Sequence, residues 1–260
     1  FTLGKIVGTF NGYLKRLSNL FELRNYDVIY IHMWVTPFGT GLFEYFFRKL
    51  SRKIIYDIED NILMLKKSEI NPIIFFLKSR KKIEYLLKNS DHIITSAPDL
   101  NDRCITLTKN NNCTYICASI NKNRFNNYKI HKNKSKTVIG WTGTFSSMQY
   151  LNELIPTFKK LSELRNFRLR IIGNFEYKMK DLDLEVLSWN KETEIQDLLE
   201  IDIGIYPLSD DEDWVLGKSG LKALQYMALG IPPVASNIGN IKNIITHSKN
   251  GYLVNNEKDW

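Results

Sequence analysis

Two lysines and two glycines around residue 220 form a pattern suited to binding phosphate. Gly217-Lys218-Ser219-Gly220 precedes a predicted helix that Gly230 ends. At about 100° per residue, Lys218, Lys222 and Gln225 share one stripe of this helix. Lysines in a first turn oppose the helix dipole, so a diphosphate neutralised by them and by the helix N–H groups explains their position. A solvated lysine pair is the alternative, and the glycine spacing does not fit a Walker A motif.

A second phosphate-binding candidate is a loop of small residues near residue 143. Ile139-Gly140-Trp141-Thr142-Gly143-Thr144 leads from a predicted strand into a loop that precedes a helix. Gly143 permits close approach of the backbone to a ligand, and the N–H groups of the next helix can hold a phosphate. Many α/β proteins contain such a turn without a ligand, so a purely structural turn is the alternative.

Carboxylates gather where the predicted strand Lys53–Ile58 ends. Asp57, Glu59 and Asp60 lie there, and His32 ends another predicted strand. Ligands in open α/β sheets bind at the carboxyl ends of the strands. These groups can therefore bind sugar hydroxyls or assist proton transfer. The alternatives are a turn-capping Asp60, a solvated Glu59 and a structural histidine. No histidine cluster accompanies them, so a metal site is not expected.

The elements that position these residues alternate between short apolar runs and longer amphipathic stretches. Several runs are continuously apolar, which is typical of parallel strands covered on both faces. The alternation predicts doubly wound sheets with right-handed crossovers. The predicted strands are 27–32, 53–58, 92–95, 114–117, 137–141, 168–172, 184–187, 202–206 and 233–235. The predicted helices are 10–23, 41–51, 72–89, 98–107, 149–164, 192–199, 220–229 and 241–247. In helix 220–229, we expect Leu221, Leu224 and Ala228 to face the core.

A linker divides the chain into two α/β domains. Asn121–Lys136 contains six Lys or Arg residues and five Asn residues, without hydrophobic periodicity. We therefore predict an N-terminal domain over 1–130 and a C-terminal domain over 131–260, with ligands in the cleft between them. An opening strand with its glycine-rich loop and a terminal helix are predicted to be missing.

Composition and charge limit the class of protein. The 260 residues are 43% hydrophobic, which is enough for a packed core, and no apolar run reaches the roughly 20 residues of a membrane span. Residues 1–136 carry 23 Lys and Arg against 11 Asp and Glu, and the basic helix 72–89 adds amphipathic character. An anionic membrane surface therefore fits the first half, with an ordinary packing helix as the alternative. Three cysteines at wide spacing favour free thiols in the cytoplasm.

Several segments of the second half occur in a characteristic order and spacing. They are Ile139–Gly143, Asp202–Leu208, Gly217–Ala228, Gly230–Ser236 and Asn250–Val254. In this order they resemble the C-terminal, donor-binding domain of retaining family-four glycosyltransferases. The first half is similar more loosely. The resemblance covers nearly the whole chain and implies the α/β GT-B fold, in which two Rossmann-like doubly wound domains face each other across a cleft, here with truncated termini.

The sequence departs from the family pattern at the donor site. The family has two glutamates eight positions apart, and Gly217 and Gln225 stand at those positions. Gln225 keeps a donor and an acceptor for ribose hydroxyls. The usual Arg and Lys that bind the diphosphate align with Thr144 and Gln149, which leaves Lys218 as the substitute cation. The resemblance therefore implies a variant donor site.

The resemblance implies retaining transfer of a hexose-type sugar from a nucleotide-diphosphate sugar to a glycan or lipid-linked acceptor, in the synthesis of cell-surface polysaccharide or glycolipid. Glu59, which aligns with the family's first-domain histidine, is a catalytic candidate together with Asp60 and Lys218. His32 and Asp57 are acceptor-side candidates. The donor-binding candidates are Gly143, Thr144, Trp189, Pro207, Ser219, Gly220, Lys222 and Gln225.

The expected partners follow from this reading. The nucleotide sugar is a co-substrate, and neither a cofactor nor a metal ion is expected, because lysine and the helix dipole neutralise the diphosphate. We expect a cytoplasmic protein, peripheral on the inner face of the membrane through its basic N-terminal domain. Nucleic acid is not expected, because no reader motif is present. The alternatives are a non-catalytic GT-B-like binding subunit and a sugar-nucleotide epimerase of the same fold.

Overall fold

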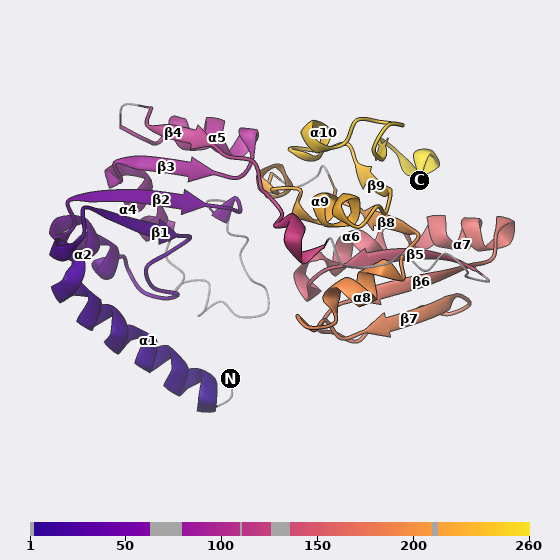
Figure 1. Ribbon diagram of the computed structural model, residues 1–260, viewed down its shortest axis with the longest axis horizontal. Coiled ribbons are helices and arrows are strands. Elements are labelled where there is room, and N and C mark those ends of the chain that lie inside the picture. The colour runs from indigo at the N-terminus through magenta and orange to yellow at the C-terminus, as the bar shows by residue number, and fades with distance from the viewer. Residues whose placement is uncertain (1–2, 63–79, 110, 126–135, 210–212) are drawn as a thin grey trace. The chain divides into compact units, whose positions relative to one another are not determined.

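The chain forms two compact α/β units (Figure 1). The computed structural model describes residues 3–62, 80–109, 111–125, 136–209 and 213–260. Unit 1 comprises Phe1–Cys117 together with the short segment Leu216–Ser219, and unit 2 comprises Ala118–Val215 and Gly220–Trp260. The predicted boundary at residue 130 lies outside the described residues, so it stays a prediction.

Unit 1 is built on a four-stranded parallel sheet with the order β1-β2-β3-β4. Each strand is short and rich in β-branched residues, and an intervening helix returns the chain so that neighbouring strands run parallel. The described elements are α1 (Leu3–Glu22), η1 (Leu23–Asn25), β1 (Val28–His32), α2 (Leu42–Leu50), β2 (Lys53–Ile58), α4 (Arg80–Asn89), β3 (His92–Thr95), α5 (Pro98–Ile105) and β4 (Cys113–Tyr115).

The central strand β2 places the acidic residues at one edge of this sheet. Ile54, Tyr56 and Ile58 alternate along β2 and are fully buried, so the strand is anchored in the core and its carboxyl end is fixed. In the register of β1 and β2, His32 lies opposite Asp57. The carboxyl ends of the two strands therefore meet at the same edge, as the sequence predicts for these side chains.

Unit 2 is built on a six-stranded parallel sheet with the order β10-β9-β8-β5-β6-β7. Its elements are η3 (Lys122–Arg124), β5 (Thr137–Thr142), η4 (Phe145–Ser147), α6 (Met148–Asn152), α7 (Ile155–Leu164), β6 (Phe167–Ile172), β7 (Asp183–Leu187), α8 (Glu194–Leu199), β8 (Ile203–Tyr206), α9 (Leu221–Ala228), β9 (Pro233–Ser236), α10 (Ile241–Ile244), β10 (Tyr252–Val254) and η6 (Glu257–Asp259). The short turn η5 (Val215–Gly217) begins in unit 2 with Val215 and continues in unit 1.

Both faces of the unit 2 sheet are covered by helices. Ile171 and Ile172 are consecutive residues of β6, point to opposite faces, and belong to different core clusters. The cluster around Ile171 contains Phe158 of α7, whereas the cluster around Ile172 contains Tyr226 of α9. This two-sided packing is the doubly wound arrangement that the alternation of elements predicts.

Glycines on two neighbouring strands allow side chains to pack closely on this sheet, and one of these side chains belongs to α9. A Cβ atom on Gly204 of β8 would lie 2.5 Å from the ring of Tyr226, and one on Gly140 of β5 would lie 2.2 Å from Ile201. Tyr226 is fully buried, and its hydroxyl accepts a hydrogen bond from the backbone N–H of Thr142 at 3.2 Å. Helix α9 is therefore tied directly to the carboxyl end of β5.

The structure corrects several predicted element boundaries. The first helix begins at Leu3 rather than at residue 10. The helix predicted over 149–164 is two helices, because α6 ends at Asn152 and α7 begins at Ile155 with a proline in its first turn. The short strand β10 was not predicted. Its three residues are too few for a recognisable alternation.

The described part of the basic helix predicted over 72–89 packs as an ordinary helix. Its apolar residues Ile83, Leu86 and Leu87 are buried in unit 1, and so is one of its cations, Lys82. The exposed residues of α4 are Arg80, Lys81 and Lys88. Residues 72–79 lie outside the described residues. Within the described residues, no helix combines the length and the apolar character needed to cross a membrane.

Candidate functional site

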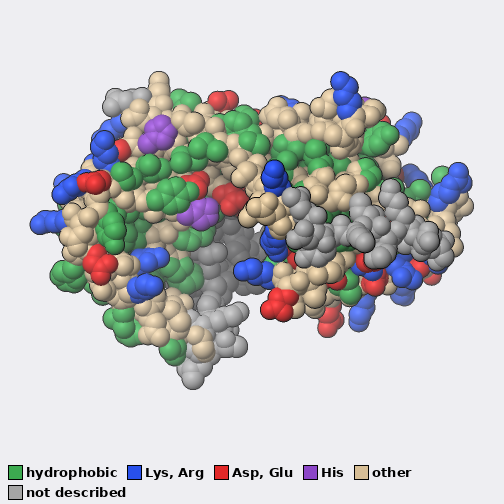
Figure 2. All heavy atoms as spheres, in the orientation of Figure 1, with side chains coloured by type: hydrophobic (Ala, Val, Ile, Leu, Met, Phe, Trp, Pro, Cys, Tyr) green, Lys and Arg blue, Asp and Glu red, His purple; other side chains and the backbone are tan. Residues whose placement is uncertain are grey.

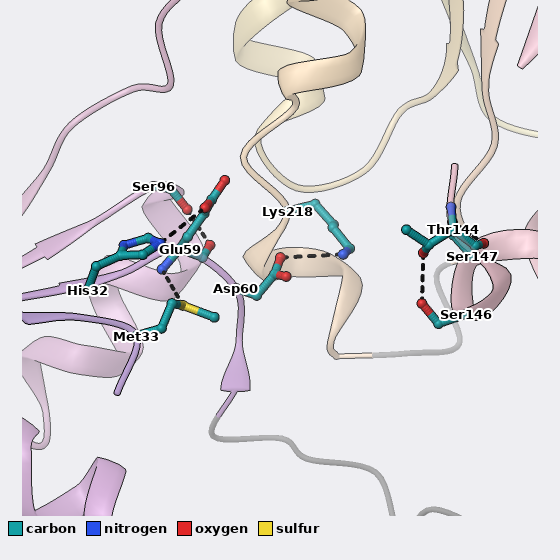
Figure 3. A network of polar contacts seen from close by, with 9 residues as sticks. All are labelled: His32, Met33, Glu59, Asp60, Ser96, Thr144, Ser146, Ser147 and Lys218. Atoms are coloured by element: carbon teal, nitrogen blue, oxygen red, sulfur yellow. Dashed lines mark hydrogen bonds and ion pairs between the residues drawn. The ribbon is translucent and has the colours of Figure 1, made fainter. Parts of the chain in front are cut away.

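The carboxyl edge of the unit 1 sheet carries a cluster of a histidine and carboxylates (Figure 3). Nδ1 of His32 lies 3.4 Å from a carboxylate oxygen of Asp57, and Nε2 lies 3.9 Å from a carboxylate oxygen of Glu59. The His32 side chain is 53% exposed, so the cluster is open to a ligand. In the space-filling view, acidic side chains lie next to a histidine on this unit (Figure 2).

Tyr30, two residues before His32 on β1, supports the same cluster. Its hydroxyl donates a hydrogen bond to the Asp57 carboxylate. Partial burial, this hydrogen bond and the negative charge of Asp57 raise the pKa of Tyr30 to about 12. The phenol therefore stays protonated at neutral pH and remains a donor that orients Asp57.

Contacts from residues that follow two neighbouring strands, β1 and β3, hold the Glu59 backbone in place. The hydroxyl of Ser96, just after β3, donates to the Glu59 carbonyl. The Glu59 N–H points at the sulfur of Met33, 3.4 Å away, and Met33 itself adopts a left-handed backbone with φ 61°. A methionine rarely adopts this conformation, which costs energy that the surrounding contacts must offset. The Glu59 side chain leaves this fixed backbone toward solvent and is 45% exposed.

Asp60 and Lys218 form an ion pair within unit 1, although they are far apart in sequence. Nζ of Lys218 lies 3.4 Å from Oδ1 of Asp60, and the two side chains are 25% and 35% exposed (Figure 3). Just before Lys218, a Cβ atom on Gly217 would lie 2.6 Å from Cβ of Asn61 and 2.7 Å from its backbone nitrogen. The backbone at Gly217 thus packs so closely that a glutamate, the residue that the resemblance leads one to expect at this position, does not fit here without a shift.

In unit 2, the loop after β5 is held by its own hydrogen bonds. The N–H of Gly143 donates to the Ile172 carbonyl at 3.0 Å, and the N–H of Thr144 donates to the Ser147 hydroxyl at 3.1 Å. Thr144 and Ser146 share a hydroxyl–hydroxyl contact of 3.0 Å on the exposed side of the loop (Figure 3). These two N–H groups are therefore already used, and the exposed hydroxyls are the groups that this loop offers to a ligand.

Helix α9 begins at a glycine, as the sequence predicts, but it buries a different stripe. Gly220 precedes the helix with φ 81°, a left-handed conformation that favours glycine, and Ser219 before it is buried. Ala223 and Tyr226 face the core, whereas Leu221 is 37% exposed and Ala228 is exposed. The predicted core stripe was therefore wrong. The space above Gly204, which only the tertiary structure reveals, admits the Tyr226 ring and sets the rotation of the helix.

This rotation brings Lys222 against two aromatic rings at the end of the sheet. Nζ of Lys222 lies 5.2 Å from the centroid of the Trp141 ring and 5.3 Å from that of Tyr206. Each such cation–π contact is worth about 0.5–2 kcal/mol, depending on desolvation. Gln225 lies almost one turn further along α9 and is half-buried.

A cavity of about 640 Å³ opens beside β7 in unit 2. Its lining includes Trp189, which is 41% exposed, and its indole N–H donates to the Glu194 carboxylate at 3.0 Å. Asn174, Ser188 and Asn190 add polar groups to the same cavity. Pro207 follows β8 directly and is buried. It therefore shapes the path of the chain as it leaves the sheet and presents no exposed surface to a ligand.

Comparison with known proteins decides the family. Residues 122–260, more than half of the chain, match the sequence profile of the family described as "Glycosyl transferases group 1". The chain belongs to the group 1 glycosyl transferases. The fold agrees with the GT-B glycosyltransferases among its structural neighbours. None of the curated proteins compared with the chain is significantly similar to it.

Solved structures of this fold match both halves of the chain. A glycosyltransferase from Rickettsia africae has a TM-score of 0.64 at 15% identity, with 96% of this chain and 68% of that chain covered. HepE of Anabaena, crystallised with UDP and glucose, has a TM-score of 0.63 at 13% identity, with 94% and 68% covered. Sucrose-phosphate synthase of Thermosynechococcus elongatus has a TM-score of 0.58 at 12% identity, with 90% and 62% covered. The glycosyltransferase therefore spans about two thirds of these chains.

Sequence reasoning missed residues that support the candidates. Tyr30 and Ser96 orient Asp57 and Glu59, and Tyr226 fastens α9 to β5. Tyr30 lies on a predicted strand, Ser96 directly follows one and Tyr226 lies on a predicted helix. Their partners lie 21 to 84 residues away and emerge only from the tertiary structure. Trp141 and Tyr206 lie at the carboxyl ends of two neighbouring strands.

Proposed function

We propose that this glycosyltransferase transfers a hexose-type sugar, with retention of anomeric configuration, from a nucleotide-diphosphate sugar to a glycan or lipid-linked acceptor. The observation that carries the proposal is the family match over unit 2, combined with Lys222 at the carboxyl end of the unit 2 sheet. Within unit 1, the ion pair of Lys218 with Asp60 adds a second ordered lysine. Synthesis of a cell-surface polysaccharide or glycolipid is the process in which such an acceptor would be used.

The donor would bind to unit 2, along the carboxyl edge of the sheet. The cavity beside Trp189 offers an exposed indole face and amide groups, which suit a nucleoside. The exposed hydroxyls of Thr144 and Ser146 and the start of α9 suit a diphosphate. Gln225 can bond a ribose hydroxyl as donor and acceptor. HepE, of the same fold, was crystallised with UDP and with UDP-glucose, which supports a uridine nucleotide as the first one to test.

Bond cleavage at the anomeric carbon leaves positive charge on the sugar and negative charge on the departing diphosphate. Lys218 would stabilise that developing negative charge, together with N–H groups at the start of α9. Its pairing with Asp60 holds the ammonium in place before the reaction, so little reorganisation is needed. This proposal requires no metal ion, because the lysine supplies the charge.

The acidic edge of unit 1 would orient sugar and acceptor hydroxyls. Glu59 and Asp60 accept hydrogen bonds from hydroxyl groups, and His32 lies between Asp57 and Glu59, where it can bond an acceptor hydroxyl. Tyr30 keeps the Asp57 carboxylate in one orientation. The incoming hydroxyl attacks on the face from which the diphosphate leaves, so its proton can pass to the departing phosphate oxygen.

The departures from the family pattern fit a variant active site. Gly217 packs on Asn61, and Lys218 takes a place in the ion pair with Asp60, so the space of the missing glutamate is filled by an ordered arrangement. A degenerate site would be expected to lose such specific contacts. The basic charge of residues 1–136 further supports a peripheral position on an anionic membrane surface, where a lipid-linked acceptor would be found.

Thermal unfolding with a panel of nucleotide diphosphates and their sugars tests the function. A ligand at 100 times its dissociation constant should raise the free energy of unfolding by about 2.7 kcal/mol. One nucleotide sugar is expected to stabilise the protein clearly and to be turned over only when an acceptor is present. Because the proposal requires no metal ion, turnover should continue in the presence of the chelator EDTA. Conversion of the donor without an acceptor would mean an epimerase, and binding without turnover would mean a non-catalytic subunit.

A further inference from the structure

The exposed indole ring of Trp189 is held at its edge by a carboxylate. Its N–H donates to Oε1 of Glu194 at 3.0 Å, and the Glu194 side chain is only 13% exposed. Trp189 itself lines the cavity of about 640 Å³ beside β7. The N–H bond of an indole lies in the plane of its rings, so this hydrogen bond restricts the direction in which the flat face points. It uses the edge of the ring and does not cover the face.

A cation from a distant part of the chain holds the other oxygen of the same carboxylate. Nη2 of Arg124, in η3, lies 2.6 Å from Oε2 of Glu194 and donates to the carbonyl of Lys191 at 3.4 Å. Both carboxylate oxygens therefore have a partner, and the loop between Trp189 and α8 is tied to η3. The guanidinium also offsets the negative charge of Glu194, which would otherwise repel an anionic ligand in the cavity.

The core of unit 2 brings these two charged residues together across 70 positions of sequence. Ile195, next to Glu194, is 4% exposed and belongs to a core cluster on which Phe125, next to Arg124, packs. Leu187, the last residue of β7, packs against the same cluster. The close packing of a core leaves little freedom to the residues that adjoin it. The core therefore places the carboxylate, and the carboxylate orients the indole ring.

We propose that Glu194 is a positioning residue for the nucleobase of the donor, and that it acts through Trp189. The indole face stacks on the base, and Arg124 keeps the carboxylate in place. This inference rests on the proposed function and deepens it. Because the indole N–H is already used, Trp189 recognises a base by its flat face alone, which every base offers. The choice among bases then falls to polar groups of the cavity such as Asn174 and Ser188.

Calorimetric titration of the full chain with UDP, ADP, GDP and inorganic pyrophosphate tests this assignment. The nucleoside diphosphate that binds best to the wild type is then titrated into Glu194→Ala. Its dissociation constant is expected to rise about 5- to 20-fold, the lower part of what losing a stacked aromatic ring costs, whereas pyrophosphate binding should not change. Glu194→Gln keeps an acceptor for the indole N–H and should lose less than about threefold. Glu192→Ala removes an exposed carboxylate from the same loop and should stay within about twofold of the wild type.

A double-mutant cycle separates an effect through the indole ring from a general loss of structure. If Glu194 acts through Trp189, adding Glu194→Ala to Trp189→Ala should weaken binding of the nucleoside diphosphate no further. Additive losses in the double variant, equal weakening of pyrophosphate, or unchanged binding in Glu194→Ala would overturn the inference while the proposed function stands. A wild-type chain that binds none of the nucleoside diphosphates would overturn both.

Discussion

Replacing Lys218 by alanine removes one ammonium group from a partly exposed ion pair. In the structure this group lies 3.4 Å from the Asp60 carboxylate. In the proposed reaction, the same group stabilises the negative charge that develops on the leaving diphosphate. The variant therefore tests catalysis and stability with a single change, and the two effects have different expected sizes.

The expected loss of stability is small, because the side chains of Lys218 and Asp60 are 25% and 35% exposed. Ion pairs with this access to solvent contribute about 1 kcal/mol or less to the free energy of unfolding. The expected loss of turnover is much larger. Removing one group that stabilises transition-state charge commonly costs about 2.7–4 kcal/mol of barrier, which lowers kcat about 10²- to 10³-fold.

Steady-state kinetics with the donor found in the unfolding panel would measure this loss. We expect kcat to fall in Lys218→Ala, whereas the dissociation constant of the nucleoside diphosphate should change less, because the proposed role of Lys218 is to stabilise charge that develops only during bond cleavage. Lys81→Ala, which removes an exposed lysine of α4 in the same unit, is the matched control and should keep wild-type kinetics. Full turnover in Lys218→Ala, with unchanged unfolding, would refute the role assigned to this lysine.

Two further predictions concern the support of the site and its location. Tyr226→Phe leaves the Thr142 N–H without its buried acceptor, so the free energy of unfolding measured in urea should fall by about 1–3 kcal/mol; the half-exposed Tyr252→Phe is the control and should lose less than about 0.5 kcal/mol. Vesicles containing anionic lipid should bind the chain at low salt and release it at about 0.5 M salt, where screening is strong. A Tyr226→Phe protein as stable as the wild type, or vesicles that capture no protein at low salt, would contradict the respective prediction.

Local patterns were sufficient to predict most elements of the fold. The runs Lys53–Ile58 and His92–Thr95 became strands with the predicted bounds, because continuous β-branched segments have few other ways to bury their side chains. The break between α6 and α7 and the short strand β10 were missed. In both cases the outcome depends on a few residues. Their local conformational preferences contribute less free energy than the packing of the elements around them.

For the candidate site, the sequence by itself determined which groups lie at strand ends and helix starts. His32, Asp57 and Glu59 follow from that rule, and parallel pairing brings them to one edge. Only the tertiary structure decided their partners: the pairing of Lys218 with Asp60, and the packing of Lys222 on Trp141 and Tyr206. The physical reason is that the rotation of a short helix depends on the space beneath it. Gly204 opens that space for Tyr226 from more than 20 residues away.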